Sequence, residues 1–193
     1  MLFRSLPGTL LGFFLLARRS ENWAAAWLAG ASLFFYGWWD YHYVPLLLFS
    51  VALNYVAAVW IRRNSGLARQ YLLTAAVIAD LALLAYFKYA DFFVSSIVRV
   101  TGVDWPALDI VLPAGISFFT FTQIAFLVDT YRGKVSEARP VHYLLFVTYF
   151  PHLIAGPVLH HKEMMPQFAD RRNYRPRAMN FAVGLTLLSI GLA

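Results

Sequence analysis

The chain has 193 residues, of which 60% are hydrophobic, 18% aromatic and 13% charged, and its mean hydropathy is +0.58. A water-soluble domain of this length does not combine these values, so the composition indicates an integral membrane protein. The net charge of +6 comes from Lys and Arg residues that lie mainly in short gaps between apolar runs. This distribution marks membrane topology and does not point to a nucleic-acid partner.

The chain contains no cysteine. Disulfides, Cys-ligated metal sites and a thiol nucleophile are therefore excluded, and any chemistry must use other side chains.

Four apolar segments in the first 90 residues predict an all-α, polytopic transmembrane protein. Residues 6–17 are short for a span of about 20 residues, whereas residues 23–39, 43–61 and 71–89 are long enough to cross. Arg18 and Arg19 directly follow the first run, where a cleaved signal peptide would carry small residues, so a signal peptide is disfavoured. No repeat or linker divides the chain, which predicts one transmembrane domain over residues 1–193.

The charges between these segments predict their orientation. Residues 18–19 and 62–69 are basic, and the loop between the second and third segments contains Asp40 instead. Because basic loops stay on the cytoplasmic side, the N-terminus and residues 91–109 are expected outside.

Two later apolar stretches, residues 112–133 and 144–168, are interrupted by Pro, Gly and charge. Irregular backbone at membrane depth survives only where it is packed in protein or lines a cavity. Two full crossings would leave the basic residues 160–177 outside, so one stretch is expected to re-enter without crossing. Pro151 and Pro157 flank Gly156 in the later stretch, which favours that one, because proline breaks helices.

Polar residues within the apolar segments are the first candidates for a site. A carboxylate such as Asp80 costs at least about 2.5 kcal/mol at the bilayer centre, and Asn54 also needs a hydrogen-bond partner there. Both a helix-bridging role and a functional role stay open for this pair. Gln123 and Asp129, in the first broken stretch, are candidates for lining a polar cavity. Lys88 and Asp91 are expected at the end of the fourth span, where snorkelling explains them.

The aromatic run at residues 34–43, which includes His42, is better explained as a membrane-interface belt than as a sugar-stacking platform. His142 is expected at the membrane interface, and the adjacent His160 and His161 in a loop. None of them has the spacing of a zinc site, so no metal site is predicted. Only His152 is flanked by apolar residues, where it could be a base, although a packing role is favoured.

The runs LPAGISFFTFTQIAFLVDTYRG and YLLFVTYFPHLIAGPVLHHKEMMPQF resemble the central signature of the bacterial membrane-bound O-acyltransferases (MBOAT), and most of all the alginate O-acetyltransferase branch. Upstream, ASLFFYGWWDYHYVPLLLFSVALNY and LLAYFKYADFF resemble the early spans of that family. The resemblance covers nearly the whole chain.

This resemblance implies a multi-pass protein of the bacterial inner (cytoplasmic) membrane that transfers an acyl group, acetyl above all, to hydroxyls of an exported polysaccharide such as alginate. It implies no bound cofactor. The acyl donor would be an acyl-CoA or an acyl carrier protein from the cytoplasm, and partner proteins of polysaccharide modification are expected beside the lipid bilayer. The basic residues 162–177 could meet such an acidic donor, although ordinary positive-inside anchoring is favoured.

The family's general-base histidine lies in a later apolar helix, and this chain ends at NFAVGLTLLSIGLA, inside its next predicted span. We therefore expect an N-terminal portion that is inactive alone, and we assign no catalytic residue. Substrate-tunnel candidates carried over from the matching motifs are Gln123, Asp129, His152, Gly156 and Pro157. Two alternatives stay open: a non-catalytic membrane assembly subunit, and a secondary transporter that uses Asp80.

Overall fold

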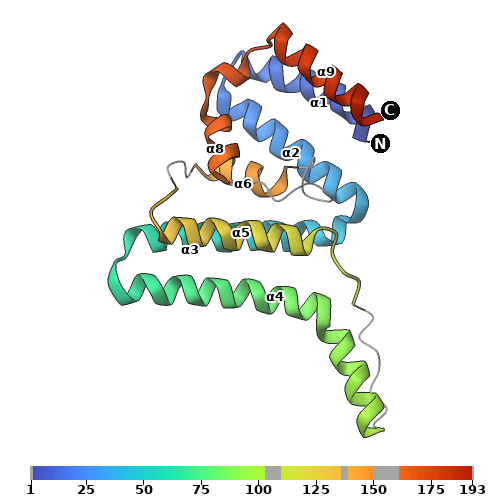
Figure 1. Ribbon diagram of the computed structural model, residues 1–193, viewed down its shortest axis with the longest axis vertical. Coiled ribbons are helices and arrows are strands. Elements are labelled where there is room, and N and C mark those ends of the chain that lie inside the picture. Colours follow the sequence, from blue (N-terminus) through green and yellow to red (C-terminus); the bar gives the residue numbers. More distant parts are fainter. Residues whose placement is uncertain (1, 103–109, 136–138, 150–160, 193) are drawn as a thin grey trace.

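The computed structural model describes residues 2–102, 110–135, 139–149 and 161–192, and every regular element among them is helical (Figure 1). The all-α prediction is therefore confirmed. The elements are α1 (Leu2–Ala17), α2 (Glu21–Asp40), the 3-10 turn η1 (Tyr41–Tyr43), α3 (Val44–Arg63), α4 (Gly66–Thr101), α5 (Ile116–Tyr131), α6 (Pro140–Thr148), α8 (His161–Ala169), the 3-10 turn η2 (Arg171–Tyr174) and α9 (Ala178–Leu192).

Helix α4 is the one early segment that differs clearly from its predicted bounds. It was expected to end at residue 89 but runs for 36 residues to Thr101, because no proline or glycine interrupts it before Gly102. Gly102 has a φ of +67°, a left-handed conformation that suits glycine, and its N–H caps the helix on the Val98 carbonyl at 2.9 Å. Lys88 and Asp91 therefore lie inside this helix.

Helices α3, α4 and α5 form a three-helix bundle whose two ends are tied by long-range contacts (Figure 1). At one end the Tyr43 hydroxyl donates to the Val111 carbonyl at 2.6 Å. At the other end Arg69, in the first turns of α4, donates to the carbonyls of Thr130 and Tyr131 at the end of α5, at 3.1 and 2.5 Å. The segment from Val111 to Tyr131 therefore runs the full length of the bundle.

The Pro–Gly interruption in residues 112–133 lies before α5, and Gly133 follows the end of the helix. Pro113 cannot donate a backbone hydrogen bond, and Gly115 has a φ of +71° at the helix N-cap. From Ile116 onward the helix is continuous. The predicted break is present, but it places the irregular backbone at the bundle end beside Tyr43 rather than in the middle of a helix.

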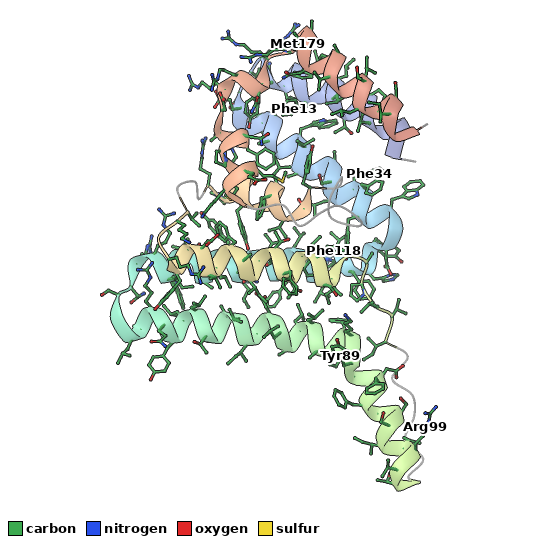
Figure 2. The ribbon with its side chains drawn as sticks, viewed as in Figure 1. Phe13, Phe34, Tyr89, Arg99, Phe118 and Met179 are labelled. Carbon is green, nitrogen blue, oxygen red and sulfur yellow. The ribbon has the colours of Figure 1, made fainter. Side chains whose placement is uncertain are left out.

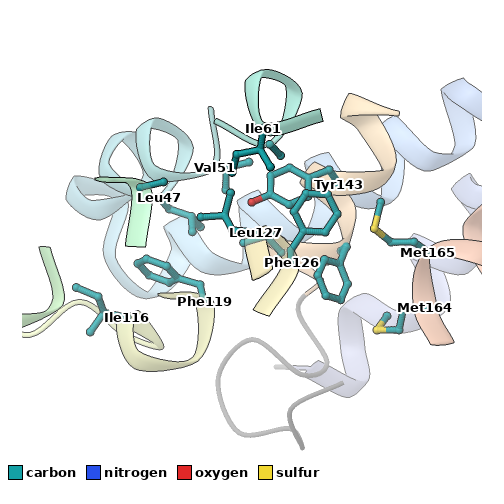
Figure 3. Close-up of a cluster of buried hydrophobic side chains, with 14 of the residues drawn as sticks. Leu47, Val51, Ile61, Ile116, Phe119, Phe126, Leu127, Tyr143, Met164 and Met165 are labelled. Atoms are coloured by element: carbon teal, nitrogen blue, oxygen red, sulfur yellow. The ribbon is translucent and has the colours of Figure 1, made fainter. Parts of the chain in front are cut away.

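A second layer packs on this bundle. Helix α6 lies against α2, α8 against α6, and α1 against α2. A shared core of buried side chains joins the layers (Figure 3), and it includes Leu47, Val51, Ile61, Phe126, Leu127, Tyr143 and Met165. His142, which we expected at the membrane interface, has a side chain that is fully buried in this layer, with its ring 6.4 Å from that of Phe168.

The outer faces of the long helices are strongly apolar. Two helical stretches in the described residues, Tyr41–Arg63 and Gly66–Thr101, are long and apolar enough to cross a membrane. Large side chains such as Phe49, Trp60 and Ile78 are more than half exposed on them. Water would penalise so much exposed apolar surface, whereas lipid accepts it, as expected for a membrane protein.

Substitution Arg69→Met is expected to lower the stability of the protein in detergent by about 1–2 kcal/mol, because it removes the positive charge that binds the carbonyl end of α5. The thermal midpoint in detergent would be measured. Arg62→Met is the matched control, since Arg62 is exposed at the end of α3. Equal midpoints for the two variants would contradict the role of Arg69.

Candidate functional site: a buried polar network

Four polar side chains from three helices meet inside the bundle. The Asn54 amide nitrogen donates to the Asp80 Oδ1 atom at 2.7 Å and to the Ser50 carbonyl at 3.1 Å. The Ser50 hydroxyl donates to Gln123 Oε1 at 3.3 Å and accepts from Gln123 Nε2 at 3.1 Å. The chain of contacts therefore connects α4, α3 and α5 in that order.

All four side chains are removed from the surroundings of the protein. Asn54 and Gln123 have no exposed surface, and Asp80 and Ser50 keep 3% and 4%. Because an unpaired polar group in an apolar interior costs free energy, the network gives each of them a partner across a helix pair. This is the arrangement that the helix-bridging interpretation of Asn54 and Asp80 requires.

The network keeps some hydrogen-bonding capacity. Within the part of the chain that the structure describes, Asn54 Oδ1 and Asp80 Oδ2 have no hydrogen-bond partner, and no Lys, Arg or His forms an ion pair with Asp80. Both atoms are acceptors, so the site can bind a further donor at these two positions.

The structure separates the predicted tunnel residues. Gln123 lies in the network, whereas Asp129 lies near the C-terminal end of α5, where its backbone carbonyl accepts from the Lys134 backbone N–H at 2.9 Å. His152, Gly156 and Pro157 lie outside the described residues. Ser50 was missed, although it precedes Asn54 by four residues and so shares its helix face.

The described histidines of η1 and α8 each lie in a separate local setting. His42 lies in η1, where its Nδ1 atom is 3.1 Å from the Asp40 carboxylate and its side chain is 69% exposed. The Asp40 carboxylate also accepts from the His42 backbone N–H at 3.0 Å, so this pair forms a local turn. His161 begins α8 rather than lying in a loop, and His160 lies outside the described residues. Among the described residues no group of His, Asp and Glu is placed to hold a metal ion.

A separate apolar groove of about 1220 Å³ lies between α1 and α9. The rings of Phe14 and Phe181 meet across it, with centroids 5.9 Å apart. Arg18, directly after α1, and Arg175, shortly before α9, both line this groove. Its lining is otherwise almost entirely apolar.

The charges near this groove are unevenly neutralised. Glu21 binds Arg171 at 2.7 Å, and Asp170 binds Arg172 at 2.9 Å. Hydrogen bonds from Arg172 hold the pKa of the Asp170 carboxyl below its ordinary value, so Asp170 stays ionised beside it. Within the described ranges no carboxylate forms an ion pair with Arg18 or Arg175. These two guanidinium groups therefore give the groove a positive rim.

Comparison with known proteins connects this architecture to acyl transfer. The chain is 40% identical to a peptidoglycan O-acetyltransferase of Helicobacter pylori over 99% of its length, and 38% identical to a probable alginate O-acetylase AlgI of Azotobacter vinelandii over 96%. A probable alginate O-acetylase AlgI of Pseudomonas aeruginosa is 37% identical over 96% of the chain. Over nearly its whole length, the chain is therefore similar to part of these O-acetyltransferases.

The MBOAT resemblance noted in the sequence is therefore confirmed. The chain spans 42%, 37% and 36% of the lengths of these three relatives, respectively. No family model matches the chain, and no solved structure matches it. The relatives include proteins named for peptidoglycan and for alginate, so identity alone does not select between these two acceptors.

If the network bridges helices, Asn54→Leu should destabilise the protein by about 1–3 kcal/mol, because it leaves the buried Asp80 carboxylate without its donor. The double variant Asn54→Leu/Asp80→Leu should recover part of this loss, since both polar partners are then absent. Thermal unfolding in detergent would measure both effects.

Thr74→Leu is the matched control for this cycle, because Thr74 is an exposed polar residue on the same helix as Asp80. Strictly additive effects of the two network substitutions would show that Asn54 and Asp80 do not depend on each other.

Proposed function

We propose that the chain is part of a membrane-bound enzyme that transfers an acetyl group to hydroxyls of an exported polysaccharide such as alginate or peptidoglycan. The observation that carries this proposal is 37–40% identity, over 96–99% of the chain, to proteins named as O-acetyltransferases of these polymers. The apolar helices support a multi-pass location, and we propose the bacterial inner membrane, where an exported polymer and a cytoplasmic donor can be reached from opposite sides.

The arrangement of the helix ends supports this topology. The contact of Arg69 with the end of α5 places the basic α3–α4 turn beside residues 131–134. The contact of Arg171 with Glu21 places the basic residues after α8 beside the α1–α2 turn. With basic ends on the cytoplasmic side, α5 crosses the membrane, and α6, which has only nine residues, enters it partway.

In this proposal the chain supplies the scaffold of the substrate path, not the acid–base group. The polar network fixes α3, α4 and α5 against one another, and the family resemblance assigns the general base to a histidine of a later helix. Asp80 then has a helix-bridging role. The transporter alternative is less economical, because it requires Asp80 to bind and release an ion or proton in addition to bridging the helices.

We further propose that the acyl donor, an acyl-CoA or an acyl carrier protein, approaches the positive rim formed by Arg18 and Arg175. Both donors are anionic, through phosphates or acidic side chains, and guanidinium groups bind such partners by charge-assisted hydrogen bonds. The rim lies at the ends of α1 and α9 that the charge rule assigns to the cytoplasm.

Deletion of the gene should remove ester-linked acetate from one exported polysaccharide. Peptidoglycan and alginate would be isolated separately, treated with mild alkali, and assayed for released acetate. A wild-type copy should restore the acetate, and a Thr74→Leu copy should do the same. Unchanged acetate in both polymers would contradict the proposed acceptors.

In the whole enzyme of which the chain is proposed to be a part, the double variant Arg18→Gln/Arg175→Gln should raise KM for the donor by roughly 10-fold, the equivalent of about 1.4 kcal/mol, with kcat nearly unchanged. The difference from the wild type should shrink as salt is added. Arg62→Gln/Arg63→Gln removes the same charge from the other basic turn and should leave KM unchanged. A similar rise in both double variants would show that only overall charge matters.

A further inference from the structure

The last third of α4 leaves the bundle. Residues of α4 that pack on the core extend from Leu72 to Phe87, and the Phe87 ring meets Tyr43 at the bundle end, with centroids 5.9 Å apart. The helix then continues to Thr101, about 20 Å further at 1.5 Å per residue. Figure 1 shows this part turning away from the direction of α3 and α5, and Figure 2 shows Tyr89 near the turn and Arg99 near the tip.

Helix α4 is too long for all of its residues to lie inside the hydrocarbon core as one straight span. A helix of 36 residues is about 54 Å long, whereas the hydrocarbon core is about 30 Å thick. Residues 66–87 already cover about that thickness. The residues after Phe87 therefore emerge at the membrane surface next to the Tyr43 end of the bundle.

The emerging part has two opposite faces. At 100° per residue, five large apolar side chains fall within one 80° sector, which we call the α4 stripe: Tyr86, Tyr89, Phe93, Ile97 and Val100. The charged side chains, together with Ser95, fall in an 80° sector on the opposite side: Lys88, Asp91, Ser95 and Arg99.

The α4 stripe is not covered by the described part of the chain. Its five side chains are 44–86% exposed, and Val100, near the tip, is the most exposed of them. Contiguous exposed apolar surface of this kind marks an interaction with a membrane or a protein. Residues 66–87 of the same helix cross the bilayer and lead directly into the α4 stripe. Lipid therefore lies next to the stripe.

We propose that residues 88–101 of α4 lie along the membrane surface, with the α4 stripe in the acyl boundary and the Lys88–Arg99 face in water. An amphipathic helix binds in this way when its apolar side chains enter the headgroup boundary and its charged side chains remain outside. Tyr86 and Tyr89 stand where the helix leaves the hydrocarbon, the position that tyrosine favours. The surface helix would fix the depth and rotation of α4, and through Asp80 those of the network.

Because the chain contains no cysteine, single cysteines can carry a fluorescent label at chosen positions. The protein would be reconstituted into phosphatidylcholine–phosphatidylglycerol vesicles with labels at Ile97, on the stripe, or Ser95, on the polar face. Brominated lipid should quench the label at residue 97 more than that at residue 95, by on the order of twofold, and aqueous iodide should show the reverse order. Labels at Leu81, on the lipid-facing side of the spanning part, and at Arg63 calibrate the lipid and aqueous limits.

Two results would overturn the proposal. Equal iodide quenching at residues 95 and 97 would mean that the helix stands in water, and protection of residue 97 from both quenchers would mean that protein covers the stripe. A second variant adds an independent check: Phe93→Asp should increase iodide quenching at residue 97, whereas the matched Ser95→Asp should not. An unchanged signal in Phe93→Asp would also overturn the proposal.

Discussion

Hydrocarbon offers no hydrogen-bond partner, and this constraint governs how the chain is built. Asp80 and Asn54 can remain within the apolar segments because they bind each other at 2.7 Å, and Ser50 and Gln123 extend the contact to α5. The same requirement explains why the irregular backbone at residues 113–115 lies at a bundle end, where Tyr43 binds the neighbouring Val111 carbonyl. Polar groups thus decide how the three helices align, while apolar packing supplies most of the contact area.

The two charged ends of the bundle have different tasks. At the Arg69 end, a guanidinium binds the last carbonyls of α5 and so holds the helix against α4. Further along the same proposed side, carboxylates among the described residues neutralise Arg171 and Arg172 but not Arg18 and Arg175. In the proposed function, the two arginines beside the groove are the ones that bind the anionic donor. The opposite end is aromatic, which suits the junction between lipid and water.

In the proposed function, acyl transfer between a cytoplasmic donor and an exported polymer requires a path through the membrane that does not leak. A rigid bundle with an internal polar network can form one wall of such a path, because its hydrogen bonds fix the helices without opening the interior to bulk water. An α4 end lying on the membrane surface would add a second restraint at the side of the polymer. In this scheme the chain provides position, and the group that activates the acceptor comes from elsewhere in the protein.

The sequence by itself determined the membrane class, the family resemblance and the early helices, and it drew attention to Asn54, Asp80 and Gln123, because composition, motifs and isolated polar residues in apolar runs are local signals. Only the tertiary structure decided which of these side chains meet. It added Ser50, whose small hydroxyl is unremarkable in an apolar helix, placed Asp129 near the C-terminal end of α5, and buried the His142 side chain in the second layer. It also extended α4 beyond the predicted span, because helix length depends on where a breaker occurs and not on the thickness of the bilayer. Contacts between helices far apart in the sequence depend on packing, which no local pattern records.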